Sequence, residues 1–566
     1  MRHGRRGHFR NSIAGGLLAA SVACAGSILP GAPALAGEFR TPSISVVRPD
    51  WQAAIDQLRR ETGPSSADDF IFKGGRWSPA LRFAVPPALR QLNGLTSAFF
   101  PGIGQSPVPV LLPFDSTLYR RDERSLPATS VPDDKSLARY QAGFRPAAFF
   151  QAGGAGYDAM FALDPGTGED MPRRVYTRPV EVHITGSQLV YEIDDPRGGK
   201  GAPVKALAAD YPDLRRMIRE GYVRYAFTRF GVPYVASIRC LDSVPHRKRL
   251  ACREAYPVAE RFLKALRVAG GMPAPSRPAI ASATVERPER ASPDFTYRPP
   301  GDIIPGSGYR NQNGHADDTV YAQIRFPLER APAFANSQSF MNWGDCYHTG
   351  RAGWRPVKGK AYRCKRNDKP LVFDESAAEN YSYPWRDNFC ETRDFEAGQC
   401  ANGYGHQGQD IRPSSCALRN DGADRCLPNL HGVVAVRDGI IIRTPGKEAT
   451  FLLINGRHEH LRFRYMHMNP KLLDADGVVH GRRVFEGERI GLVSNFQDYP
   501  GGTTSHLHFD VQVFTRDGWL WVNPYVTLIA SYERLIDGRG REIEPPPPAP
   551  TAPPAIADAA ARQPAD

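Results

Sequence analysis

Beyond residue 36 the sequence has no hydrophobic run long enough to cross a bilayer, which takes about 20 apolar residues in a helix. It also has no Cys-x-x-Cys pair, the spacing typical of cysteine zinc clusters. The first absence excludes an integral membrane segment from the mature chain, which we expect to be soluble in its compartment. The second argues against a cysteine metal cluster, so the cysteines need another explanation.

Acidic residues are absent from residues 1–36. This stretch carries four arginines, then a run rich in Gly, Ala and Leu from Ile13, and small residues at Ala34 and Ala36. A basic start, an apolar middle and a small-residue cleavage site are typical of a secretory signal peptide. We therefore expect an exported protein, located in the periplasm or in the extracellular cell envelope. Sec and twin-arginine export both stay open.

Neither sign of charge dominates the remaining chain. Cleavage removes four arginines, so the formal net charge falls by four, from +12 to +8. A modest positive balance suits an anionic partner such as cell-wall polymer, and it is equally the ordinary surface of an exported protein. We expect no nucleic-acid partner, and the oligomeric state is left open.

Eight cysteines lie outside the signal peptide. An even count in an exported protein predicts disulfide bonds. Nearest-neighbour pairing joins Cys240 with Cys252, Cys346 with Cys364, Cys390 with Cys400 and Cys416 with Cys426. Each short loop would add about 2–4 kcal/mol by restricting the unfolded chain. Spacing alone leaves the connectivity open.

The chain is too long for one core and predicts an α+β protein with several segments. In order, we expect a signal peptide (1–36), an α+β N-terminal module of unknown role (37–270), a linker rich in Pro and Ala (271–305), a cysteine-rich lead-in (306–399), a mainly antiparallel β domain (400–535) and a disordered Pro-rich tail (541–566).

Within the N-terminal module, apolar patterns predict two strand pairs and one helix. One pair is Val180 to Ile184 with Gln188 to Glu192, as a hairpin around Gly186. The second pair is Val223 to Phe227 with Pro233 to Ile238, and the helix covers residues 257–268. In the C-terminal domain, six short strands are expected at 431–436, 439–443, 450–454, 461–467, 489–493 and 506–514.

Imidazoles and one carboxylate gather in three stretches of the C-terminal domain. They are His406 and Asp410 beside glycines, His467 near the end of a strand pattern, and His506 with His508 in a His-x-His pair. A catalytic zinc ion takes three nitrogen or oxygen ligands and leaves a fourth position for water. Five such residues therefore supply a zinc site with two histidines to spare.

Side chains alternate between the two faces of a strand, so His506 and His508 should share a face opposite Leu507 and Phe509. The same rule places His467 on the apolar side of its strand. A second His-x-His, His458 with His460, has the opposite parity, and we expect it to be exposed near the turn at Asn455 and Gly456.

The motifs of this domain are, in chain order, Gly-x-Gly-His406-x-Gly408-x-Asp410, Val434-Ala-x-x-Asp438-Gly439, Tyr465-x-His467, Gly487-x-x-Ile490-Gly491 and Gly501-x-x-x-Ser505-His506-Leu507-His508-Phe509. This order resembles the lysostaphin-type, LytM-like zinc metallopeptidases that cut peptidoglycan. The resemblance covers roughly residues 400–527. It implies one Zn²⁺ held by His406, Asp410 and His508, with His467 and His506 as the catalytic pair, and hydrolysis of stem or cross-bridge peptides in peptidoglycan.

Two other functions fit the same pattern. One is a non-catalytic wall-binding protein, or an activator of other cell-wall hydrolases, whose groove is occluded. The other is a zinc protease with a protein substrate. All five polar positions are present, which favours an enzyme. The resemblance also implies a latency hypothesis, in which Asn311, Asn313 or His315 supplies a temporary fourth ligand.

Overall fold

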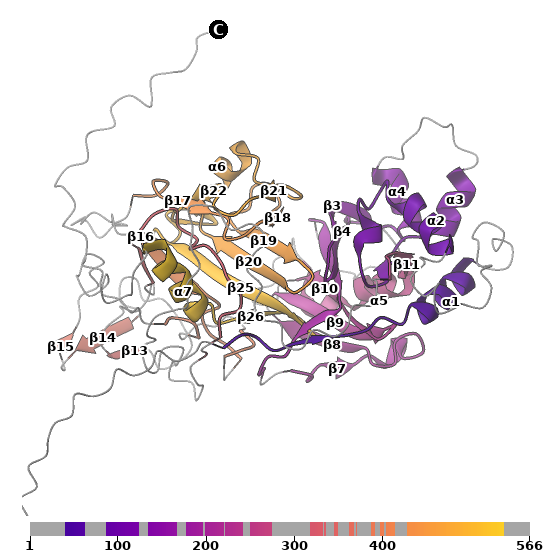
Figure 1. Cartoon of the computed structure of the whole chain (residues 1–566), viewed down its shortest axis with the longest axis horizontal. Coiled ribbons are helices and arrows are strands. Elements are labelled where there is room, and N and C mark those ends of the chain that lie inside the picture. The colour runs from indigo at the N-terminus through magenta and orange to yellow at the C-terminus, as the bar shows by residue number, and fades with distance from the viewer. Residues whose placement is uncertain are drawn as a thin grey trace, which may run out of the picture. The chain divides into compact units, whose positions relative to one another are not determined.

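In the computed structural model, the chain consists mainly of antiparallel β-sheets with few helices (Figure 1). It describes residues 40–62, 87–123, 134–166, 177–195, 198–219, 221–240, 250–273, 317, 319–331, 333–335, 345–348, 362–366, 369–370, 387–390, 397–400, 403–413 and 427–536. Within these ranges, every helix is too short or too polar to span a bilayer. The expected signal peptide, most of the linker, the proline-rich tail and the three latency candidates lie outside the described residues.

The N-terminal segment forms a seven-stranded sheet with the strand order β3-β4-β5-β10-β9-β8-β7. Its helices are α1 (Trp51–Thr62), α2 (Pro87–Thr96), α3 (Ser116–Glu123), α4 (Asp134–Tyr140) and α5 (Tyr256–Ala265). Its strands are β1 (Ile44–Val46), β2 (Val110–Leu112), β3 (Arg145–Ala152), β4 (Gly156–Leu163), β5 (Val180–Ser187), β6 (Leu189–Tyr191), β7 (Ala202–Pro203), β8 (Arg215–Arg219), β9 (Tyr222–Arg229), β10 (Val232–Arg239) and β11 (Arg267–Gly270). Helix α5 has a proline in its first turn and buries Val258 and Phe262, four residues apart, in the core of this segment.

One of the two predicted strand pairs is confirmed and the other is wrong. Strands β9 and β10 pair antiparallel as expected. Strand β5 instead runs straight through Gly186 and pairs with β4 and β10, while β6 pairs with β1. A Cβ on Gly186 would lie 2.5 Å from the Tyr234 ring and 2.8 Å from the Tyr157 ring. This glycine therefore admits two aromatic rings against the sheet and makes no turn.

The C-terminal segment forms an eight-stranded antiparallel sheet with the order β12-β16-β25-β20-β19-β18-β21, and β26 also pairs with β25 (Figure 1). Its elements are β12 (Ala333–Ala335), β13 (Asp345–His348), β14 (Tyr362–Arg366), β15 (Lys369–Pro370), β16 (Gln409–Pro413), β17 (Gly432–Val434), β18 (Gly439–Ile442), β19 (Thr450–Asn455), β20 (His460–Met466), α6 (Pro470–Ala475), β21 (Arg483–Val484), β22 (Arg489–Leu492), β23 (Phe496–Gln497), β24 (Tyr499–Pro500), β25 (Leu507–Thr515), β26 (Gly518–Val522) and α7 (Tyr525–Ile536). All six strands predicted for this domain are present within one or two residues of their expected ends.

Strand alternation places the core on one face of this sheet. Phe463 and Tyr465 of β20 are buried beside Phe509 of β25, and Tyr465 and Phe509 are direct cross-strand partners. Helix α7 and residues 320–328 contribute to the same apolar cluster. Part of the predicted lead-in thus packs with the β domain, and the described residues from Arg40 onward belong to one compact unit. The predicted boundaries stay predictions.

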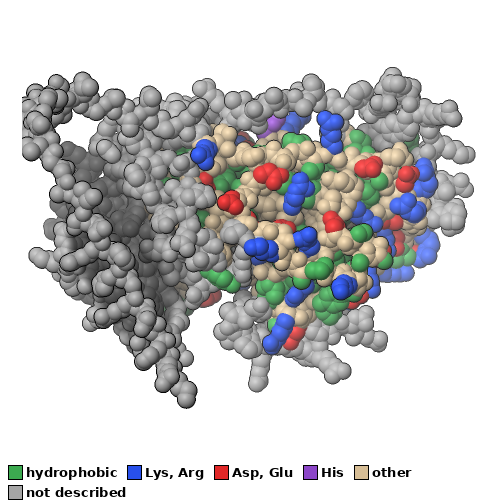
Figure 2. Space-filling model, turned by 90° about the horizontal axis from the view of Figure 1, so that it is seen from below, with side chains coloured by type: hydrophobic (Ala, Val, Ile, Leu, Met, Phe, Trp, Pro, Cys, Tyr) green, Lys and Arg blue, Asp and Glu red, His purple; other side chains and the backbone are tan. Residues whose placement is uncertain are grey.

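Two of the four predicted disulfides are present among the described side chains: Cys240–Cys252 and Cys390–Cys400. Cys346 and Cys364 are backbone partners across β13 and β14, but their side chains lie outside the description, as do Cys416 and Cys426. On the face shown in Figure 2, Lys and Arg side chains are interspersed with Asp and Glu over the described part. That mixture leaves both interpretations of the positive charge open.

Candidate metal centre

Three predicted ligands meet in one buried cluster. The Nε2 atom of His406 lies 3.2 Å from Oδ1 of Asp410 and 3.1 Å from Nδ1 of His508. Oδ1 of Asp410 lies 3.2 Å from the same Nδ1 of His508. The three ligand atoms thus form a nearly equilateral triangle among side chains that are all buried.

Strand register creates this triangle. Asp410 in β16 and His508 in β25 are direct cross-strand partners, so both side chains leave the same face of the sheet. Gly408 lies beside them, where a Cβ would come within 2.3 Å of the Phe509 carbonyl oxygen and 3.0 Å of Nε2 of His508. Only glycine lets β16 approach β25 this closely, which explains the glycine between the two ligands in the motif.

The second nitrogen of each ligand imidazole also has a polar neighbour. Nδ1 of His406 donates to the carbonyl oxygen of Asn388 at 2.9 Å, because a carbonyl can only accept. That bond leaves the Nε2 lone pair of His406 directed at the cluster. Nε2 of His508 lies 3.3 Å from Oδ2 of Asp510, which directs its Nδ1 in the same way.

The charge on Asp410 is strongly favoured. Burial opposes ionisation of this carboxyl, but the His406 and His506 rings outweigh it and hold the pKa of Asp410 well below its ordinary value. Asp410 is therefore an anion at neutral pH. Two imidazoles and one carboxylate at these distances form a ready ligand set for a divalent cation.

The separations suit a small cation. Three tetrahedral ligands about 2.0 Å from a metal ion lie about 3.3 Å from one another. The observed sides of 3.1 to 3.2 Å need only slight expansion. Because nitrogen and oxygen donors of two imidazoles and a carboxylate converge here, the residues present fit a divalent metal ion.

The other two predicted site residues lie next to this triangle. Nε2 of His506 is 3.3 Å from Oδ1 of Asp410, and the rings of His467 and His506 are 4.6 Å apart. Nδ1 of His506 donates to the Thr504 carbonyl at 2.6 Å, and Nδ1 of His467 donates to the Phe496 carbonyl at 3.0 Å. Both rings therefore keep an Nε2 lone pair available as a proton acceptor.

His467 is held neutral at ordinary pH. Burial, together with the neighbouring His506 and His508 rings, holds the pKa of His467 well below its usual value. The alternation rule was wrong about its orientation, because it placed this ring on the apolar face with Tyr465. His467 follows the last residue of β20 and has a φ of 69°, a left-handed conformation that turns its ring toward His506 and His508.

The prediction for the second His-x-His was half wrong. His458 is exposed, whereas His460 is completely buried. Its Nε2 lies 2.8 Å from Oδ2 of Asp158 in β4, and its Nδ1 lies 2.9 Å from Oγ of Ser187 in β5. This Ser–His–Asp arrangement resembles a hydrolase triad, but all three residues are at most 1% exposed, which leaves no access for a substrate. The parity argument failed because the N-terminal sheet covers this face of β20.

Sequence reasoning missed three residues beside the centre. Asp510 could have been found from the sequence, because it follows His508 by two residues and therefore lies on the same face of the strand. Glu448 precedes β19, and its Oε1 lies 3.7 Å from Nδ1 of His467. Burial is the main cause that raises the pKa of Glu448 to about 7. Asn388 acts through its backbone carbonyl, so neither it nor Glu448 left a pattern in the sequence.

Comparisons with known proteins add one structural likeness. No protein-family model matches the chain, and no curated protein matches it. A solved structure from Ruminococcus gnavus ATCC 29149, described as a "putative glycyl-glycine endopeptidase lytM", is 21% identical over 24% of this chain. The match spans 51% of that protein, about half its length, with a TM-score of 0.17.

Proposed function

We propose that this protein is an exported zinc-dependent endopeptidase that hydrolyses peptide bonds in peptidoglycan. One observation carries the proposal: the buried triangle of His406 Nε2, Asp410 Oδ1 and His508 Nδ1, with two further imidazoles beside it. The ordered glycine and histidine motifs of the LytM-like family support the same conclusion from the sequence. The metal, substrate and compartment belong to the proposal.

Zinc suits this ligand set, because two imidazoles and one carboxylate are typical of catalytic zinc sites that keep a position open. When bound, zinc would polarise a substrate carbonyl and make a water molecule more acidic. His406, Asp410 and His508 would hold it. The carbonyl of Asn388 and the carboxylate of Asp510 orient the two imidazoles, which the ion then does not have to reorganise.

His506 and His467 would accept and donate the protons of the reaction. Each ring has its Nδ1 proton committed to a backbone carbonyl and its Nε2 lone pair free to accept. His506 is closer to the ligands, at 3.3 Å from Asp410, so its Nε2 is the base for the attacking water. The proton that His506 takes from the water then has to reach the leaving amine. His467, whose ring lies 4.6 Å from the His506 ring, can accept that proton on Nε2 and pass it to the amine, because its lowered pKa favours release.

The proposed substrate class rests on the sequence motifs and on the features of an exported protein. Peptidoglycan is favoured by the family motifs together with the features of an exported protein, which include the two disulfides. The N-terminal sheet contacts the β domain through buried polar bonds, such as the one between Asp158 and His460. We therefore infer that this segment supports the catalytic sheet, and that any wall binding by it is a second role.

Digestion of purified peptidoglycan tests the function. The full mature chain should release peptide fragments with new amino termini, and a chelator should abolish release until zinc is restored. His508→Ala, which removes a ligand, serves as the inactive control for contaminating hydrolases. A non-catalytic wall-binding protein would sediment with peptidoglycan and release nothing. Release of peptides from casein but not from peptidoglycan would instead identify a protease with a protein substrate.

A further inference from the structure

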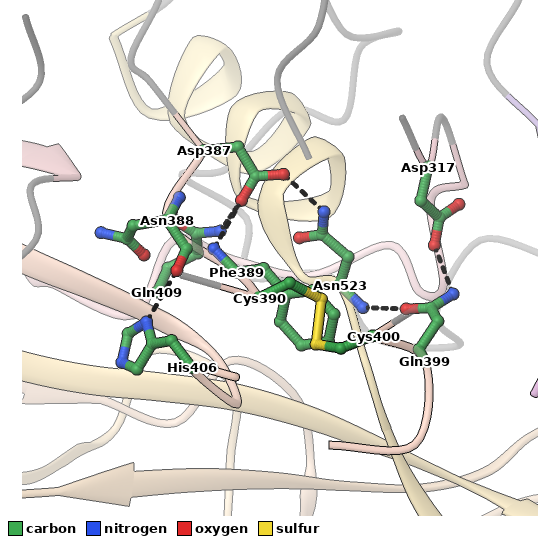
Figure 3. The surroundings of a disulfide bond; sticks show 10 residues. All are labelled: Asp317, Asp387, Asn388, Phe389, Cys390, Gln399, Cys400, His406, Gln409 and Asn523. Atoms are coloured by element: carbon green, nitrogen blue, oxygen red, sulfur yellow. Dashed lines mark hydrogen bonds between the residues drawn. A yellow bond between two sulfur atoms is a disulfide. The ribbon is translucent and has the colours of Figure 1, made fainter. Parts of the chain in front are cut away.

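The Cys390–Cys400 disulfide lies in a segment that contacts a proposed metal ligand directly (Figure 3). The ring of His406 donates to the Asn388 carbonyl at 2.9 Å, and the backbone N–H of Cys390 donates to the His406 carbonyl at 2.9 Å. Both the ring and the backbone of this ligand are therefore bonded to residues 388–390. Gly405, just before the ligand, lies so close that a Cβ there would come within 2.7 Å of Cα of Cys390.

Little apolar packing holds this segment. Its buried apolar cluster consists of Phe389, Cys390, Ala397 and Cys400, so two of its four members are the bonded cysteines. Cys390 also has a φ of 58°, an unfavourable left-handed conformation for a residue with a side chain. With so small a cluster and a strained backbone at Cys390, the disulfide is the main covalent or apolar restraint on the ring partner of His406.

The other end of the disulfide is anchored to the β domain. Gln399, next to Cys400, donates to Oδ2 of Asp317 at 2.8 Å and accepts from the backbone N–H of Asn523 at 2.6 Å (Figure 3). Asp387 anchors the near end by polar bonds, since its Oδ1 accepts from the N–H of Phe389 at 2.8 Å and from Nε2 of Gln409, and its Oδ2 accepts from Nδ2 of Asn523 at 2.5 Å. The disulfide thus connects the residues that hold His406 to residues fixed in the domain.

We propose that the Cys390–Cys400 disulfide positions the ligand His406, so that the metal affinity of the centre depends on this bond. The inference rests on the proposed function, because it assumes a metal at His406, Asp410 and His508. Without the bond, Asn388 keeps its backbone hydrogen bond to Oε1 of Gln409 at 3.2 Å but loses the covalent connection to Cys400, so the His406 ring is held less tightly. The loss of metal affinity should match that seen when a metal ligand loses its outer hydrogen-bond partner, which weakens metal binding about 10–100-fold.

The second disulfide provides a matched control. Cys240–Cys252 has the same chemistry, with a sequence separation of 12 against 10, but belongs to the large apolar core of the N-terminal segment. The zinc dissociation constant is measured by competition with a chromogenic chelator for three proteins: wild type, Cys390→Ser with Cys400→Ser, and Cys240→Ser with Cys252→Ser. Replacing Cys390 and Cys400 should weaken zinc binding about 10–100-fold. Replacing Cys240 and Cys252 should leave the zinc affinity within about twofold of wild type, since this disulfide contacts no ligand. Equal affinity in all three overturns the proposal.

A reciprocal measurement on the wild-type protein covers the case in which the first double variant does not fold. If the disulfide strengthens zinc binding, zinc must stabilise the disulfide by the same factor. In a glutathione redox buffer at fixed free zinc, alkylation and peptide mass spectrometry give the reduced fraction of each bond. Zinc should protect Cys390–Cys400 by about 10–100-fold and leave Cys240–Cys252 unchanged. In His508→Ala, zinc should give no protection.

The outcomes separate this inference from the proposed function. Zinc binding with no peptidoglycan cleavage rejects the function and leaves the disulfide effect to be measured. Cleavage and zinc binding that do not respond to Cys390–Cys400 reject the disulfide role alone. Wild-type protein that binds zinc no better than His508→Ala rejects both.

Discussion

Asp158→Asn should destabilise the protein by cutting the buried bond between the two sheets. Asp158 accepts from His460 at 2.8 Å, from Arg462 at 2.7 Å and from Thr185 at 2.7 Å. Burial opposes its charge, but His460 and Arg462 outweigh burial and lower the pKa of Asp158 from 3.8 to about 2. That difference corresponds to about 2 kcal/mol of stability at neutral pH. Leaving Arg462 buried beside a neutral amide raises the expected loss to about 3–5 kcal/mol.

The pH dependence gives the sign of the effect. A carboxylate with a lowered folded pKa stabilises fully above its unfolded pKa, and the contribution disappears as the pH falls through the folded value. The wild-type protein should thus lose about 2 kcal/mol between about pH 5 and pH 2, and Asp158→Asn should lack this part of the acid response.

Denaturant unfolding at pH 7 and pH 3 measures both effects. Asp164→Asn is the matched control, because it neutralises an Asp in an ion pair with Arg145 whose side chains are 43% and 34% exposed. The control should cost less than about 1 kcal/mol. If Asp158→Asn is no more destabilising than Asp164→Asn at pH 7, the argument that this buried network joins the two sheets fails.

The remaining predictions concern the centre itself. His508→Ala should lose bound zinc, measured by elemental analysis of the purified protein, together with peptidoglycan hydrolysis. His467→Ala should keep the metal and lose about 10²–10⁴ in turnover, and equal metal loss in both variants would contradict this division of roles. Glu448→Gln should unfold at a higher temperature than wild type at pH 8 and at a similar one at pH 4, because the raised pKa of Glu448 costs stability progressively from about pH 4.5, where the unfolded chain ionises, to about pH 7. If Glu448→Gln raises the unfolding temperature as much at pH 4 as at pH 8, the charge of Glu448 is not the cause of the stabilisation.

Much of the β domain followed from sequence because its signals are local. Alternating apolar residues predicted β20 and β25, and the same period correctly placed His506 and His508 on one face with Leu507 and Phe509 on the other. Spacing between cysteines predicted the two described disulfides. The five polar site residues were selected by their order along the chain, and the structure brings all five together.

Gly186 and His467 show where local rules failed. A glycine between two strand patterns predicts a turn, yet at Gly186 two tyrosine rings from neighbouring strands need the space of a missing side chain. Alternation assigns a face only while the backbone stays extended, and the positive φ of His467 ends that rule at the end of β20. Both errors arise because a neighbouring strand, or a single backbone angle, changes the meaning of a local pattern.

The sequence by itself determined six strands of the β domain and the identity of the candidate ligands. These depend on side-chain period and on residue chemistry, which are written along the chain. Tertiary structure alone decided that His460 is buried against Asp158 and that the Asn388 carbonyl orients His406. Partners that are 302 and 18 residues apart leave no periodic signal, and a carbonyl oxygen is common to every residue type. Such contacts become specific only when folding brings the two segments together.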